Sequence, residues 1–216
     1  MVGLTCITLY LRGGDRSFGA RVGPVVVLVL AYLIVPGVLA LSGVLNQYEP
    51  VPRPIVLVVA LTALTLRVAF SPFGARLASS LSLASLVGFQ FFRVPVELVL
   101  HRLAVEAVIP YVMTYVGWNF DILTGFSAAV LGFLLARRSI PRTVLLMWNV
   151  AGLLLLANIV AIAALAAPVP FQFFTDGPSN TLPSSFPYVW LPTVLVQLAL
   201  FGHLLLFRRL RVIAAD

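Results

Sequence analysis

The sequence contains few charged residues and no lysine. Charged residues make up 10% of its 216 residues, whereas soluble domains average about 25%. All 14 basic residues are arginines, so a retinal or any other cofactor held by a lysine Schiff base is excluded. The single cysteine, Cys6, excludes an internal disulfide, and no cysteine and histidine spacing fits a metal site.

The apolar residues, 61% of the chain with a mean hydropathy of +1.08, form continuous runs. Continuous runs of about 20 residues are typical of membrane-spanning helices, whereas a barrel requires alternation. We therefore predict an all-α, polytopic membrane helix bundle with about six transmembrane helices in one domain, residues 23–210. The expected spans are residues 23–45, 54–70, 83–105, 120–136, 144–167 and 189–207.

The arginines predict the orientation, because cytoplasmic loops retain positive charge. With both termini cytoplasmic, all arginines except Arg53, Arg93 and Arg102 fall on the cytoplasmic side. Residues 1–22 are then a cytoplasmic or interfacial arm and residues 211–216 a cytoplasmic tail. The net charge of +7 indicates the topology and an attraction to anionic lipid, and we expect no nucleic-acid partner. We expect the protein in the bacterial cytoplasmic membrane.

Ionisable residues lie inside the third predicted span. Arg93, Glu97 and His101 are spaced four apart, so they form one stripe on a helix. Intramembrane charges cost free energy to insert and indicate a functional site by default. Pro95 removes one helical hydrogen bond and is expected to kink the helix there, while Arg102 is expected to reach the outer interface.

Other polar residues fall at comparable depths in the neighbouring spans. At a rise of about 1.5 Å per residue, we expect an outer cluster that continues inward. The candidate ligand- or proton-binding residues are Arg93, Glu97, His101, Asn158, Gln197, Asp121, Asn149 and His203; Glu97 and Asp121 are also the candidate catalytic residues.

Structural roles compete with these functional ones. Arg93 and Glu97 can form a self-neutralising intrahelical ion pair, and Asn149 and Asn158 can be interhelical hydrogen-bonding residues. Asp121 begins a predicted helix, where a carboxylate complements the helix dipole.

The sequence limits the cofactors without naming one. A haem held by both His101 and His203 is disfavoured, because the two are expected at different depths; a haem with one histidine ligand, or a quinone, stays open. No glycine-rich phosphate-binding loop is present, which excludes nucleotide-driven transport by this chain alone.

Several short motifs in the C-terminal part of the chain carry a resemblance. They are Gly-Trp-Asn-Phe-Asp-Ile-Leu-Thr-Gly at 117–125, Trp-Asn at 148–149, Pro-Val-Pro-Phe at 168–171, Phe-Pro-Tyr-Val-Trp-Leu-Pro at 186–192, and His203. This combination resembles a group of small uncharacterised bacterial multi-pass membrane proteins, a likeness that implies a membrane fold and no activity. Pro95-Val96-Glu97 is similar to the first part of the Pro-x-Glu-Glu/Asp motif of membrane-embedded carotenoid cyclases, with Leu98 in place of the second acid.

Three functions remain open from the sequence. The first is a protein that binds or passes a small solute, ion or proton at the third span. The second is a membrane enzyme acting on a lipid or isoprenoid, with Glu97 or Asp121 as general acid and residues 168–187 as a lid or re-entrant cap. The third is a subunit of a homo-oligomer or larger membrane complex. The expected partners are the lipid bilayer and a small-molecule or lipid ligand.

Overall fold

The computed structural model describes residues 18–212, with side chains described from residue 26 onward. Its described part is all-helical and contains no strand. The elements are α2 (Phe18–Leu41), η1 (Val44–Asn46), α3 (Arg53–Phe70), α4 (Pro72–Ser80), α5 (Leu83–Gly88), η2 (Phe89–Phe92), α6 (Arg93–Val105), η3 (Tyr111–Met113), α7 (Ile122–Leu135), α8 (Arg142–Leu165), η4 (Leu182–Ser184), the π-helical turn η5 (Leu191–Leu195) and α9 (Val196–Val212).

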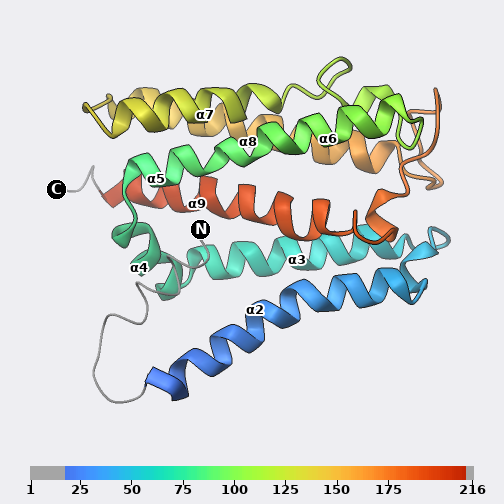
Figure 1. Cartoon of the computed structure of the whole chain (residues 1–216), viewed down its shortest axis with the longest axis horizontal. Helices are drawn as coiled ribbons and strands as arrows, with labels where there is room; N and C mark the ends of the chain where they lie inside the picture. Colours follow the sequence, from blue (N-terminus) through green and yellow to red (C-terminus); the bar gives the residue numbers. More distant parts are fainter. Residues whose placement is uncertain (1–17, 213–216) are drawn as a thin grey trace.

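Four of the described helices are long and apolar enough to cross a membrane, which indicates a membrane protein. They cover Arg53–Phe70, Leu83–Val105, Arg142–Leu165 and Leu191–Val212, and two shorter apolar helices cover Val26–Leu41 and Ile122–Leu135. The long helices run side by side (Figure 1). The positions agree with the predicted spans to within a few residues, apart from the last helix, which continues to Val212.

The predicted terminal segments fall mainly outside the described residues. Of the predicted arm, only residues 18–22 are described, as the beginning of α2; of the predicted tail, only Arg211 and Val212 are described. Between two predicted spans, the stretch after α3 forms the short helix α4, which Ser71 caps by accepting the N–H of Gly74.

The sequence predicts a kink at Pro95, but the helix departs from regular α-helical geometry before this residue. Residues Phe89–Phe92 form a 3₁₀ turn, and α6 begins at Arg93. Pro95 is therefore in the first turn of α6, where its missing N–H has no cost. The irregularity thus precedes the charged residues instead of separating Arg93 from Glu97.

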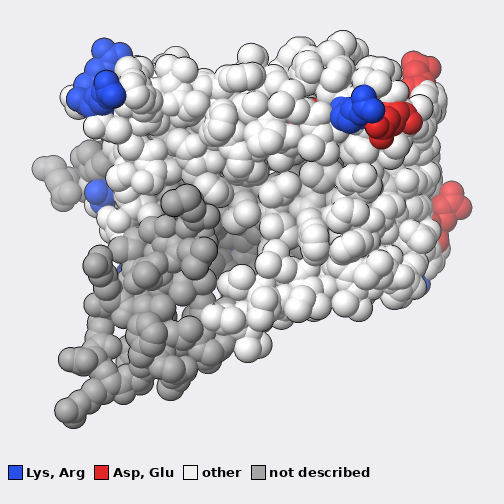
Figure 2. Space-filling model, viewed as in Figure 1, with Lys and Arg blue, Asp and Glu red and all other residues white. Residues whose placement is uncertain are grey.

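Charge is distributed toward the two ends of the bundle. On the face shown in Figure 2, a broad uncharged surface lies between an end that carries basic side chains and an end that carries acidic side chains beside a basic one. Among the described residues, Arg67 lies in the last turn of α3, Arg76 lies in α4, Arg137 and Arg138 follow α7, and Arg142 begins α8. In Figure 1, α4, the end of α7 and the beginning of α8 lie at the same end of the bundle as the end of α9. An uncharged lateral surface is the surface expected of a protein surrounded by lipid.

Candidate functional site

Four buried polar residues from four helical segments form one hydrogen-bonded network, which we call the Arg93 network. Nε of Arg93 donates to Oδ2 of Asp121 at 2.6 Å, and a second guanidinium nitrogen pairs with the other carboxylate oxygen. Nη1 of Arg93 lies 3.0 Å from Nε2 of His203. Nδ1 of His203 lies 2.8 Å from Oδ1 of Asn149, whose Nδ2 donates to the carbonyl of His203 at 3.2 Å.

The donors and acceptors of this network determine the histidine tautomer. A guanidinium can only donate, so Nε2 of His203 accepts from Arg93. Nδ1 must then carry the proton and donate to Asn149. Both ring nitrogens are thereby used, which leaves neither of them free to ligate a haem iron.

Small residues bring these helices close enough for the network to form. A Cβ atom added to Gly125 of α7 would lie 2.7 Å from Cγ2 of Val94. This contact brings Asp121, one turn earlier, up to Arg93. On α8, a Cβ atom on Gly152 would lie 2.5 Å from Cε1 of His203, so glycine there provides the space for the imidazole.

Glu97 lies one turn after Arg93 on α6 and has a separate partner. Nδ2 of Asn119 lies 2.8 Å from Oε1 and 2.6 Å from Oε2 of Glu97, and also donates to the carbonyl of Met113 at 3.0 Å. Oδ1 of Asn119 accepts the N–H of Asp121 at 3.1 Å, an Asx turn that begins α7. Asn119 therefore links Glu97 to the element that carries Asp121.

A cavity of about 460 Å³ reaches this group of side chains. Its walls come from α3, α6, α8, η5 and the start of α9, and Asn180, Leu182 and Pro183 also line it. Arg93, Glu97 and Asp121 are on its lining, and most other lining residues are apolar. We call it the Glu97 cavity; its volume is within the range of small-molecule sites, about 300–1,000 Å³.

The sequence candidates divide into three groups in space. Arg93, Asp121, Asn149 and His203 form the Arg93 network, and Glu97 lies beside it; all five are buried. Gln197 is also buried but bonds Thr62 and Thr65 of α3. The partner of Arg93 in the described part of the chain is Asp121 rather than Glu97, so the proposed intrahelical ion pair is not formed.

His101 and Asn158 lie outside the network. The ring of His101 stacks on Tyr115 with centroids 4.7 Å apart, and the side chain is only half-buried. Nδ2 of Asn158 donates to the carbonyl of Trp118 at 2.8 Å, which ties α8 to the segment before α7. The stripe predicted from spacing thus ends at Glu97, and His101 contacts the rings of Tyr111 and Tyr115 instead of the network.

Sequence reasoning missed several buried polar residues, of which Asn119 contacts Glu97 and Gln90 is fully buried. Asn119 could have been found from Asn-Phe-Asp before a helix, since an Asx turn places Asn two residues before its bonded N–H. Gln90 in η2 is fully buried and donates to the carbonyl of Ala199 at 3.0 Å. No spacing rule signals Gln90, because its burial depends on how α9 packs against η2.

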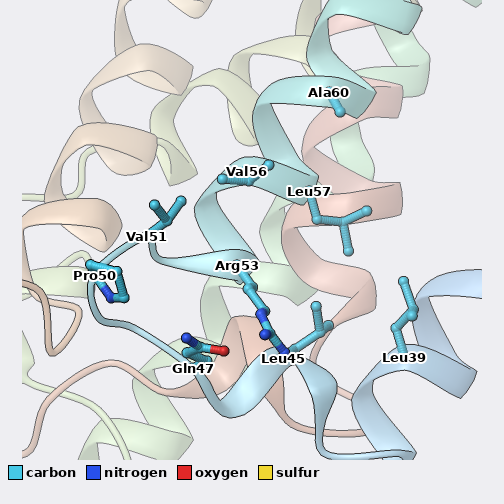
Figure 3. Close-up of a pocket in the computed structure, with 9 residues that line it drawn as sticks. All are labelled: Leu39, Leu45, Gln47, Pro50, Val51, Arg53, Val56, Leu57 and Ala60. Carbon is cyan, nitrogen blue, oxygen red and sulfur yellow. The ribbon is translucent and has the colours of Figure 1, made fainter.

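A second hollow lies at the loop end between α2 and α3 (Figure 3). Its lining is mostly apolar, with Gln47 and Arg53 as the polar side chains. Arg53 is exposed, and its Nη1 donates to the carbonyl of Val44 at 3.2 Å. Because this surface hollow brings no buried ionisable group to a ligand, the Glu97 cavity is the stronger candidate.

The segment 168–187 is held against the end of α8. Asn180 donates through Nδ2 to the carbonyl of Ala163 at 3.0 Å and through its backbone N–H to Ala166 at 2.8 Å. Tyr48 lies in the loop between α2 and α3, outside the spans, and its hydroxyl oxygen is 3.0 Å from Oγ of Ser184. Burial raises the pKa of the Tyr48 hydroxyl. Asn180, Leu182 and Pro183 of this segment also line the Glu97 cavity.

The described residues contain no group of three His, Cys, Asp or Glu side chains that could hold a metal ion. Comparisons with protein-family models, with curated proteins and with solved structures give no match to this chain. The class of protein is therefore defined by the fold and the site without a known relative. It is a helical membrane protein with a buried polar network beside an apolar cavity.

Proposed function

We propose that the protein is a multi-pass protein of the bacterial cytoplasmic membrane with about six spans and both termini cytoplasmic. The apolar segments Val26–Leu41 and Ile122–Leu135 support two spans in addition to the four long helices. The arginines at the helix ends support the orientation, because positive loops remain on the cytoplasmic side.

Within this framework, we propose that the protein binds a small ligand in the Glu97 cavity. The observation that carries the proposal is that an apolar cavity reaches a buried carboxylate, Glu97, which is 2% exposed. A charge buried at membrane depth costs about 2.5 to 3.5 kcal/mol on insertion scales. A ligand whose polar group contacts the carboxylate of Glu97 would offset this cost, which explains why a buried carboxylate borders an open cavity.

Binding is better supported than passage through the bundle. Leu145 and Leu206 lie one turn from Asn149 and His203, on the side of the helix ends that carry arginine. They belong to a buried apolar cluster, which gives a proton or ion no hydrogen-bonding partners. Transport would therefore require this cluster to separate.

A membrane enzyme with Glu97 as general acid is a second candidate. It is favoured by the position of Glu97 on the lining of an apolar cavity, where a lipid or isoprenoid substrate would fit. Asp121 is less suited to this role, because both of its oxygens face the guanidinium of Arg93. Lipid extracts from cells with wild-type protein and with Glu97→Gln would differ if this enzyme activity exists.

The binding proposal is tested by native mass spectrometry of the protein purified in a mild detergent. Ala161 lines the cavity, whereas Met147 on the same helix is 73% exposed and does not line it. We expect wild type and Met147→Phe to carry a non-covalent mass that Ala161→Phe lacks. Identical spectra for the three proteins would contradict binding in this cavity.

A further inference from the structure

The chemistry of the Glu97 cavity points to a class of ligand, and this inference rests on the binding function proposed above. The lining is mostly apolar along α3, α8 and α9, and its charged side chains are Arg93 and Glu97 of α6 and Asp121. Tyr48 and Asn180 also line the cavity from loop segments, and Nδ2 of Asn180 is already engaged by the carbonyl of Ala163. Ile55 and Val58 contribute from α3, Leu156 and Val160 from α8, and Leu195 from η5. A ligand that fills this space must be mostly apolar, with one polar end.

The opening of the cavity lies on the lateral surface of the bundle. Val59 of α3 is 61% exposed and also lines the cavity. Ala157 and Ala161 of α8 are likewise both exposed and on the lining. Because these residues belong to helices long enough to span the membrane, the opening faces the hydrocarbon layer and admits molecules dissolved in the bilayer.

The polar end of the cavity can accept hydrogen bonds but offers few donors. The guanidinium of Arg93 is engaged by Asp121 and His203. The carboxylate of Glu97 is contacted, among the described side chains, by the single amide of Asn119, which it shares with the carbonyl of Met113. A carboxylate has about four acceptor positions, so Glu97 retains acceptor capacity toward the cavity.

The formal charges at this end of the cavity also favour a ligand head that donates hydrogen bonds. Arg93 and Asp121 neutralise each other as an ion pair, which leaves Glu97 without a cationic partner of its own. A carboxylate or phosphate head would find no free cationic partner here, because the guanidinium of Arg93 is engaged by Asp121, so burial of such a head is disfavoured. A head that donates hydrogen bonds complements Glu97.

We propose that the Glu97 cavity takes from the bilayer an amphiphile with an apolar chain and one hydrogen-bond-donating head, a hydroxyl or an amine, which donates to Glu97. The chain lies along α3 and α8. Asn180, Leu182 and Pro183 complete the lining of the cavity.

Photolabelling in nanodiscs of uncharged phosphatidylcholine tests this proposal. The probes are three diazirine-bearing chains of equal length that end in a hydroxyl, an amine or a carboxylic acid. Labels are located by mass spectrometry and compared between residues 157–164, which include cavity-lining residues, and Met147, which faces outward. We expect the alcohol and the amine to label residues 157–164 about tenfold more than the acid does, the factor for loss of a charge-assisted hydrogen bond.

Two substitutions at position 97 separate the contributions of charge and hydrogen bonding. Glu97→Gln keeps an acceptor, so we expect it to retain alcohol labelling and to lower amine labelling. Glu97→Leu removes the acceptor and is expected to lower both. If Glu97→Leu fails to fold, the change in the ratio of amine to alcohol labelling in Glu97→Gln remains decisive.

Two results would overturn the ligand class. One is acid labelling of residues 157–164 equal to or above that of the alcohol; this would leave the binding site in place but exclude a donor head. The other is an amine-to-alcohol ratio that Glu97→Gln leaves unchanged. Absence of label from all three probes at residues 157–164, with a bound mass still lost in Ala161→Phe, would overturn the amphiphile and keep the proposed function.

Discussion

Arg93 and Glu97 lie one turn apart on α6, yet the protein surrounds them in opposite ways. Arg93 has an acidic partner, a histidine acceptor and closely packed helices around it. Glu97 shares one amide with a backbone carbonyl and borders a cavity. The comparison teaches that two buried ionisable groups one turn apart can have different roles: Arg93 is satisfied by its partners and holds helices together, whereas Glu97 has fewer partners and, in the function proposed above, meets a ligand.

The largest expected effect tests the structural side of this comparison. Asp121→Ala leaves the guanidinium of Arg93 buried without its acidic partner, and breaking a buried pair costs about 3–5 kcal/mol. We expect a marked fall in the melting temperature of the purified protein in detergent. The double variant Arg93→Leu with Asp121→Ala should be more stable than Asp121→Ala alone, and equal or lower stability would contradict the role of the pair.

The close packing around the network gives the next prediction. Gly152→Ala places a methyl group against the imidazole of His203, and overpacking costs about 1–3 kcal/mol. Thermal unfolding measures the loss of stability. Gly37→Ala is the matched control, because its added Cβ would lie no closer than 3.6 Å to the side chain of Trp190; an equal loss in both variants would show that the His203 contact is not special.

Glu97→Gln should separate stability from binding. The amide retains an oxygen that accepts from Asn119, so we expect a stability change of about 1 kcal/mol or less, the net value of one hydrogen bond. The same variant should change ligand binding. A loss of stability as large as that of Asp121→Ala would remove the distinction between the two ions.

The smallest effect is expected at the exposed end of α6. Nε of Arg102 lies 2.8 Å from Oε1 of Glu106, and both side chains are well exposed. Such pairs contribute about 0.3–0.5 kcal/mol, so Glu106→Gln should leave the melting temperature nearly unchanged. A large shift would mean that the ion pairs cannot be ranked by burial.

Much of the architecture could be predicted from the sequence, because long apolar runs have few stable structures in a membrane. The positions of the long helices follow from those runs, and buried Arg93, Glu97 and Asp121 follow from charges within them. The pairing of those charges could not be predicted. Spacing of four suggested Arg93 with Glu97, whereas the packing of Gly125 against Val94 brings Asp121 to Arg93 instead.

The sequence by itself determined that the chain is helical, apolar on its lateral surface and charged at a few interior positions, since these properties depend on composition and local periodicity. Only the tertiary structure decided which interior charges are satisfied. Hydrogen bonds between helices depend on rotation and separation to within about an ångström, and no local pattern specifies these. That is why the contact of Asn119 with Glu97, the burial of Gln90 and the Glu97 cavity emerge only when the helices are packed together.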